Sequence, residues 1–169
     1  KMAGLMAAAI LSDTVMFKSP TCTKKDIAMA ERLARIARIS LKDLGRELFS
    51  STSDGKSAEE LLGTDYKEFH ISGQTIGVGQ ITCVDSSKLV ERRDEFIAAM
   101  EKVKQNSNCD LVILMITDVL LDGSHIFYVG SDDVMQEAFS TVPKDKHMFL
   151  PKVMSRKKQI IPMLTAMWG

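Results

Sequence analysis

Apolar residues recur at helical intervals through the first fifty positions of the chain. The first run predicts a packed helix that ends at Asp13. Its apolar positions are Met2, Leu5, Met6, Ala9 and Ile10. Thr23 is suited to cap a second helix that reaches about Ile39, and Ser40 is suited to cap a third that reaches about Phe49. The N-terminal part of the chain is therefore predicted to be helical.

A polar stretch follows at residues 50–57. It contains serine, threonine, aspartate, glycine and lysine but no large apolar residue, and this composition is typical of a flexible connector. We therefore place a linker at 51–56. Residues 1–50 are then the end of one domain, and residues 57–169 form a second.

Beyond the linker the period changes from helical to extended. Residues 69–71 and 76–81 indicate two strands joined at Gly73 and Gln74. The continuous apolar run 111–116 predicts a strand buried on both faces, with 126–129 as its neighbour. Helices are predicted at 88–105, at 133–139 and in a tail at 155–168 that is disturbed at Pro162. This alternation predicts an α/β class, with α+β as the alternative: a mixed sheet with flanking helices.

Composition removes several classes of partner and site. Lys plus Arg and Asp plus Glu both number 22, so the net charge of zero gives no general attraction to nucleic acid. The first apolar run is about ten residues long, too short to cross a bilayer, so no membrane association is expected. Three cysteines without paired spacing indicate reduced thiols and a cytoplasmic protein. The three histidines are widely spaced, so we interpret them as structural residues.

The candidate functional residues are a cationic run in the tail and isolated charged residues elsewhere. Arg156 and Lys157 open the predicted tail helix, where the helix dipole disfavours positive charge and a bound phosphate would offset it. A solvated basic patch is the alternative. Asp13 ends a rigid helix and could be a hard oxygen ligand for Mn or Mg, or simply a helix-terminal carboxylate. Glycines 77 and 79 do not make a dinucleotide fingerprint and indicate a bulge or a close backbone approach.

The run from Ala3 to Thr23, with Ser12, Asp13 and Thr14 at its centre, resembles a signature stretch of family II inorganic pyrophosphatases. The similarity continues through 65–69, 80–85, 110–118 and 155–159, which match the DHH-associated domain of that family. The resemblance implies a two-domain enzyme whose active site lies between a metal-binding DHH domain and a domain that closes over the substrate. Residues 1–50 are then a helical remnant of the DHH domain.

The resemblance also implies roles for particular residues. Asp13 matches a metal ligand, and Lys67, Arg156 and Lys157 match residues that grip inorganic pyrophosphate. Lys67 alone would pass for a surface lysine. The metal would be Mn, with Mg or Co as alternatives, and it would activate the water that attacks phosphorus.

Three expectations concern the protein as a whole. The Asp-His-His motif is absent, so we expect this chain to need an N-terminal DHH domain as partner and to be inactive alone. An exopolyphosphatase or other DHH-superfamily phosphoesterase, and a non-catalytic phosphate-binding module, stay open as alternatives. A homo-oligomer is equally open.

Overall fold

The computed structural model describes residues 1–14, 16–17, 20, 22–50 and 56–168, with side chains at 48–50 left outside the description. The predicted linker at 51–56 falls almost wholly outside the described residues, and the domain boundary there stays a prediction.

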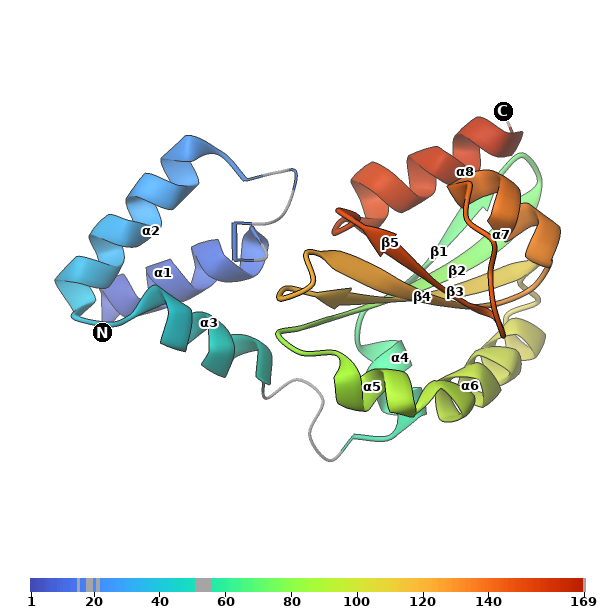
Figure 1. Cartoon of the computed structure of the whole chain (residues 1–169), viewed down its shortest axis with the longest axis horizontal. Coiled ribbons are helices and arrows are strands. Elements are labelled where there is room, and N and C mark those ends of the chain that lie inside the picture. The colour runs from blue at the N-terminus through green and yellow to red at the C-terminus, as the bar shows by residue number, and fades with distance from the viewer. Residues whose placement is uncertain (15, 18–19, 21, 51–55, 169) are drawn as a thin grey trace.

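The N-terminal part consists of the helices α1 (Met2–Asp13), α2 (Lys24–Ala37) and α3 (Leu41–Ser50). Thr23 caps α2 as predicted: its hydroxyl accepts from the Asp26 N–H, and the Asp26 carboxylate accepts from the Thr23 N–H at 2.8 Å. Helix α1 buries Ala7 and Leu11, and it packs against α2 and α3. These helices form a group of their own beside the sheet of the C-terminal part, and α3 contacts one of its strands (Figure 1).

A five-stranded sheet organises the C-terminal part. Its strands are β1 (Tyr66–Ile71), β2 (Gln74–Cys83), β3 (Leu111–Asp118), β4 (Gly123–Val129) and β5 (His147–Pro151). They lie in the order β1-β2-β3-β4-β5, with β2 and β3 parallel and the other neighbours antiparallel. Every residue of β3 is buried, as its continuous apolar run predicted. The predicted α/β class with a mixed sheet is confirmed.

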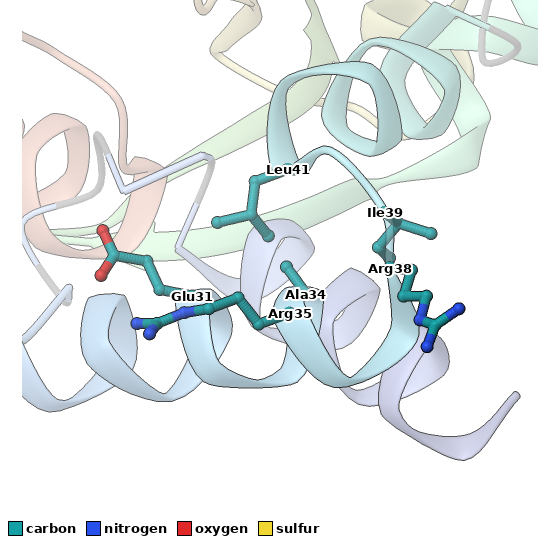
Figure 2. A pocket seen from close by; sticks show the side chains of 6 residues that line it. All are labelled: Glu31, Ala34, Arg35, Arg38, Ile39 and Leu41. Atoms are coloured by element: carbon teal, nitrogen blue, oxygen red, sulfur yellow. The ribbon is translucent and has the colours of Figure 1, made fainter.

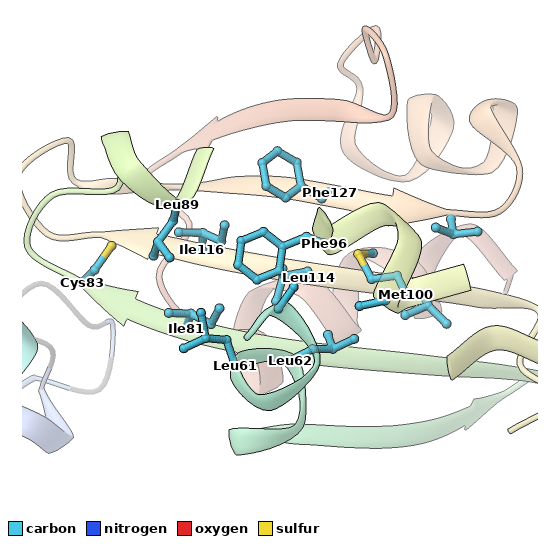
Figure 3. Packing of buried hydrophobic residues seen from close by; sticks show 14 of the residues in the cluster. Leu61, Leu62, Ile81, Cys83, Leu89, Phe96, Met100, Leu114, Ile116 and Phe127 are labelled. Carbon is cyan, nitrogen blue, oxygen red and sulfur yellow. The ribbon is translucent and has the colours of Figure 1, made fainter. Parts of the chain in front are cut away.

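Helices cover both faces of the sheet (Figure 1). One face carries α4 (Ala58–Thr64), α5 (Ser87–Glu91) and α6 (Arg93–Asn106), and the other carries α7 (Asp132–Phe139), the π-helical turn η1 (Arg156–Ile160) and α8 (Ile161–Trp168). Figure 3 shows the first core, in which Phe96 of α6 lies against Leu114 and Phe127 of the sheet. A second core lies under η1 and α8 and includes Val78, Ile160 and Leu164.

The structure departs from the predicted elements in four places. The helix predicted at 88–105 is divided at Arg92, which lies between α5 and α6. Helix α4 and strand β5 were not predicted. The disturbance expected at Pro162 lies just before it, as the wide turn η1, because proline has no N–H to give to the preceding turn.

The close backbone approach predicted at Gly77 and Gly79 is confirmed. A Cβ on Gly77 would lie 1.9 Å from the Tyr66 hydroxyl oxygen, and one on Gly79 would lie 2.9 Å from a Leu62 methyl carbon. Among the described residues, no helix has both the length and the apolar composition required to cross a bilayer. All three cysteines are free thiols, and two of them, Cys83 and Cys109, are buried.

Candidate anion-binding site

The turn η1 carries the cationic run into the structure. Ser155 precedes it in an extended conformation, and its hydroxyl accepts from the Lys158 N–H at 3.3 Å, as an N-cap does. π-helical turns are rare and often mark functional sites. In Figure 1 this end of η1 and α8 lies on the side of the sheet that faces α1–α3.

Arg156, the first residue of η1, is buried with its side chain fixed. Its Nη1 donates to the backbone oxygens of Asp65 at 2.9 Å and Val78 at 3.0 Å, and its Nη2 donates to the Asp65 carboxylate at 2.9 Å. The residue is 8% exposed, so Asp65 is the counter-charge that a buried guanidinium requires. A guanidinium has five N–H donors. Bonds to the described residues use three, and Nε–H and one Nη2–H remain for another acceptor.

Lys67 reaches the same place from β1. Phe69 and Ile71 of β1 pack against the core under η1 and α8, and side chains alternate along a strand, so Lys67 lies on that face too. Its partner across the β1–β2 pair is Val78, whose carbonyl binds Arg156. The structure thus brings Lys67 and Arg156 together around one residue of β2, with Lys67 exposed.

Lys157 follows Arg156 in η1 and is exposed, as is Lys158. Two of the predicted anion-binding residues are therefore adjacent in the first turn of η1, and the third is on the strand beneath. We call Lys67, Arg156 and Lys157 the cation cluster. The crowding of positive charge predicted at this helix end is partly offset within the chain, because Asp65 pairs with Arg156.

Asp13 is the exposed last residue of α1, a helix that runs from the N-terminus toward the sheet (Figure 1). The next residue, Thr14, is buried, and its hydroxyl donates to the Ile10 carbonyl at 2.6 Å, so the last turn of the helix is held by a side chain as well as by the backbone. In the described ranges, no three His, Cys, Asp or Glu side chains group as a metal site. Asp13 is therefore a single candidate ligand, and the described residues do not complete a metal centre.

A histidine pair lies on the opposite face of the sheet. His125 of β4 and His147 of β5 place Nδ1 and Nε2 2.9 Å apart, so one ring donates a hydrogen bond to the other. Burial lowers the pKa of both, and for His147 the neighbouring His125 and Arg93 lower it further. Sequence reasoning missed the pair because its members are 22 positions apart and β5 was not predicted. Both rings are half-buried, and their interpretation as structural residues stays a prediction.

Two of the cavities lined by described residues lie away from the cation cluster. One of about 540 Å³ is between α2 and α3, where Figure 2 shows Arg35 and Arg38 pointing away from each other. The other, of about 370 Å³, lies at the carboxyl ends of β2 and β3. Its buried carboxylate, Asp118, already accepts hydrogen bonds from Ser86 and Leu121. Neither arrangement directs several cations at one point.

Comparison with known proteins shows the family to which the chain belongs. The family described as "DHHA2 domain" matches residues 46–167. The chain belongs to the DHHA2 domain family. The DHHA2 match begins within α3 and ends in α8, so it includes the whole sheet and the cation cluster.

Relatives of this DHHA2 protein are named as pyrophosphatases. The manganese-dependent inorganic pyrophosphatase of Methanothrix thermoacetophila is 42% identical in an alignment of 169 positions, which covers 97% of this chain and 54% of that protein. The cobalt-dependent inorganic pyrophosphatase of Clostridium perfringens is 39% identical over 96% of this chain and 30% of its own length.

A solved structure agrees. The crystal structure of a Methanococcus jannaschii protein described as a family II inorganic pyrophosphatase matches with a TM-score of 0.86 and 36% identity, over 98% of this chain and 55% of that one. The predicted resemblance to family II inorganic pyrophosphatases is confirmed. The chain spans about half the length of the Methanothrix and Methanococcus proteins, and less of the Clostridium one.

Proposed function

We propose that this chain supplies the substrate-binding half of a cytoplasmic inorganic pyrophosphatase, in which Lys67, Arg156 and Lys157 bind pyrophosphate. The observation that carries the proposal is that Lys67 is paired with Val78 in the β1–β2 ladder, while Arg156 donates to the Val78 carbonyl and Lys157 is next in the chain. The names of the relatives support pyrophosphate as that anion. The free, buried thiols of Cys83 and Cys109 fit a reducing compartment.

The three cations have different roles in binding, because arginine and lysine side chains differ in their chemistry. Arg156 is held in one orientation by Asp65 and Val78, so its two remaining N–H donors are fixed before the substrate arrives. Lys67 and Lys157 are exposed point charges that can follow the phosphate oxygens. In phosphoryl transfer negative charge grows on the oxygens that leave, so cations placed there stabilise the transition state more than the ground state.

We assign Asp13 as one ligand of the divalent metal that this reaction uses. Such a metal supplies an activated water when it is bound. Manganese is the expected ion, because the Methanothrix relative is manganese-dependent, and the Clostridium relative makes cobalt an alternative. Since the described residues do not complete a metal centre, we expect the other ligands to come from an N-terminal DHH domain and the chain alone to be inactive.

The test is to restore a metal-binding half. A chimera joins the 169-residue chain behind the N-terminal part of the Methanothrix thermoacetophila relative, and manganese-dependent phosphate release from pyrophosphate is measured. We expect hydrolysis by the chimera and none by the chain alone. Faster turnover of tripolyphosphate than of pyrophosphate would point to an exopolyphosphatase instead, and binding without hydrolysis would point to a non-catalytic module.

Variants of the chimera test the residue roles. Lys67→Ala, Arg156→Ala and Lys157→Ala should each lower kcat/KM by about tenfold or more, since each removes a charged contact with the substrate. Lys144→Ala is the matched control, because Lys144 is also an exposed lysine but lies in the connection between α7 and β5. Unchanged kcat/KM in all three cluster variants would overturn the assignment.

A further inference from the structure

The segment 152–155 connects β5 to η1 and directly precedes Arg156 and Lys157 of the cation cluster. Hydrogen bonds from the sheet and from η1 hold this segment. Val153 and Met154 are buried, so their backbone groups need partners inside the protein. The N–H of Lys152 donates to the Asp122 carbonyl at 2.8 Å. The carbonyls of Val153 and Met154 are bound by side chains of the sheet.

Those side chains form one connected chain of hydrogen bonds. The Gln80 amide nitrogen donates to the Met154 carbonyl at 3.2 Å and to the Thr117 hydroxyl at 3.1 Å. The hydroxyls of Thr117 and Ser124 are 3.0 Å apart, and Ser124 donates its own proton to the Val153 carbonyl. Thr117 must therefore donate to Ser124. We call Gln80, Thr117 and Ser124 the polar relay: it begins at one carbonyl and ends at its neighbour.

The relay lies in the sheet beneath η1. Gln80 follows Val78 by two residues on β2, so both side chains are on the face that η1 and α8 cover. Val78 receives the Arg156 guanidinium through its carbonyl, while Gln80 holds the backbone two residues before Arg156. One strand thus fixes both the tip of this arginine and the segment that leads into it.

Gln159 holds the same segment from the side of η1. Its side-chain oxygen accepts from the N–H groups of Met154 and Ser155, at 2.8 and 2.9 Å, and its amide nitrogen donates to the Lys152 carbonyl at 2.9 Å. The segment is therefore bound from the sheet and from the helix at once. Connected hydrogen bonds of this kind rigidify the backbone that they hold.

We propose that Gln80, through Thr117 and Ser124, is a positioning residue for substrate binding: it holds residues 153–154 so that Arg156 and Lys157 present their charges at one place. The inference rests on the proposed function for the identity of the substrate. A relay that only satisfied buried carbonyls would contribute to stability, but its loss would affect the enzyme equally with or without Arg156.

Hydrogen exchange of the 169-residue chain tests the positioning without any activity. Gln80→Met keeps the size of the side chain and removes both donors, so amide exchange across 152–160 should accelerate by about tenfold relative to the rest of the sheet. Thr82→Val is the matched control: Thr82 is on the same face of β2, half-buried, and makes no side-chain hydrogen bond to any described residue. Unchanged exchange across 152–160 in Gln80→Met would overturn the inference.

Kinetics of the chimera then test the link to the substrate. Gln80→Met should lower kcat/KM for pyrophosphate by about tenfold. The same change in a background that carries both Arg156→Ala and Lys157→Ala should alter it by less than about twofold, because both positioned groups are already gone. Thr117→Val, which breaks the relay with little change of shape, should show the same coupling. Losses that multiply in full in the combined variants would contradict positioning.

An inactive chimera with the unsubstituted chain would count against the proposed function alone. The exchange measurement would still decide whether Gln80 holds the segment.

Discussion

The pair formed by Asp65 and Arg156 makes a quantitative prediction about stability. Asp65→Asn keeps the shape of the side chain and removes the counter-charge of a guanidinium that is 8% exposed. A hydrogen bond to a charged group contributes about 1.5–3 kcal/mol. The Asp65 side chain is 49% exposed and Arg156 keeps two backbone acceptors, so the loss should lie at the lower end. We expect a decrease in the free energy of unfolding of about 1–2 kcal/mol.

The assay is thermal or urea unfolding of the chain at neutral pH. For a chain of this length the decrease corresponds to a Tm lower by about 2–8 °C. Glu59→Gln is the matched control, because the Glu59–Lys102 ion pair is 3.0 Å long and so nearly equal in length, but both its side chains are more than half exposed. A surface pair contributes little, and salt screens it. If Glu59→Gln destabilised the chain as much as Asp65→Asn, the reasoning from burial would be wrong.

Two further predictions concern other parts of the sheet. Gly77→Ala should lower the free energy of unfolding by about 1–3 kcal/mol because the new methyl group meets the Tyr66 ring. In a Tyr66→Ala background, which lacks that ring, Gly77→Ala should cause a much smaller further loss; equal Tm values for Gly77→Ala and the unsubstituted chain would contradict the close approach. Burial lowers the pKa of His125 and His147 in the folded state, so the unfolded chain binds more protons just below pH 6.5, and stability should be complete above that pH and decrease as the pH falls through the window beneath it. The charge of Asp118 opposes the lowering of the His125 pKa, and Arg93 adds to the lowering of the His147 pKa. The free energy of urea unfolding should therefore depend less on pH in a His125→Phe, His147→Phe double variant.

Local patterns predicted the elements whose environment is simple. Strand β3 is buried on both faces, and its uninterrupted apolar run needs no tertiary information. Thr23 forms the reciprocal hydrogen bonds of a capping box with a residue three positions away, so its role as a helix cap can be predicted from the local sequence. Strand β5 was missed because it is an edge strand of five residues that contains a histidine and ends at Pro151.

The cation cluster could be predicted only in part. Residue types and family resemblance pointed to Lys67, Arg156 and Lys157, but the sequence suggested unpaired cations at a helix end. The partner of Arg156 is Asp65, 91 positions away, and no local pattern links the two. Likewise, the meeting of Lys67 and Arg156 at Val78 depends on which face of β1 the tail helix covers. The polar relay could not be predicted either, because its three residues come from three strands that are far apart in the sequence.

Binding of one anion by the cation cluster can be measured directly by titrating the 169-residue chain with pyrophosphate and following the Arg156 Nε–H and the Nζ groups of Lys67 and Lys157 by NMR. We predict that all three signals shift along curves that give one dissociation constant, and that added salt weakens all three together. Shifts with different dissociation constants, or a response of one residue alone, would contradict the claim that these side chains bind a single anion.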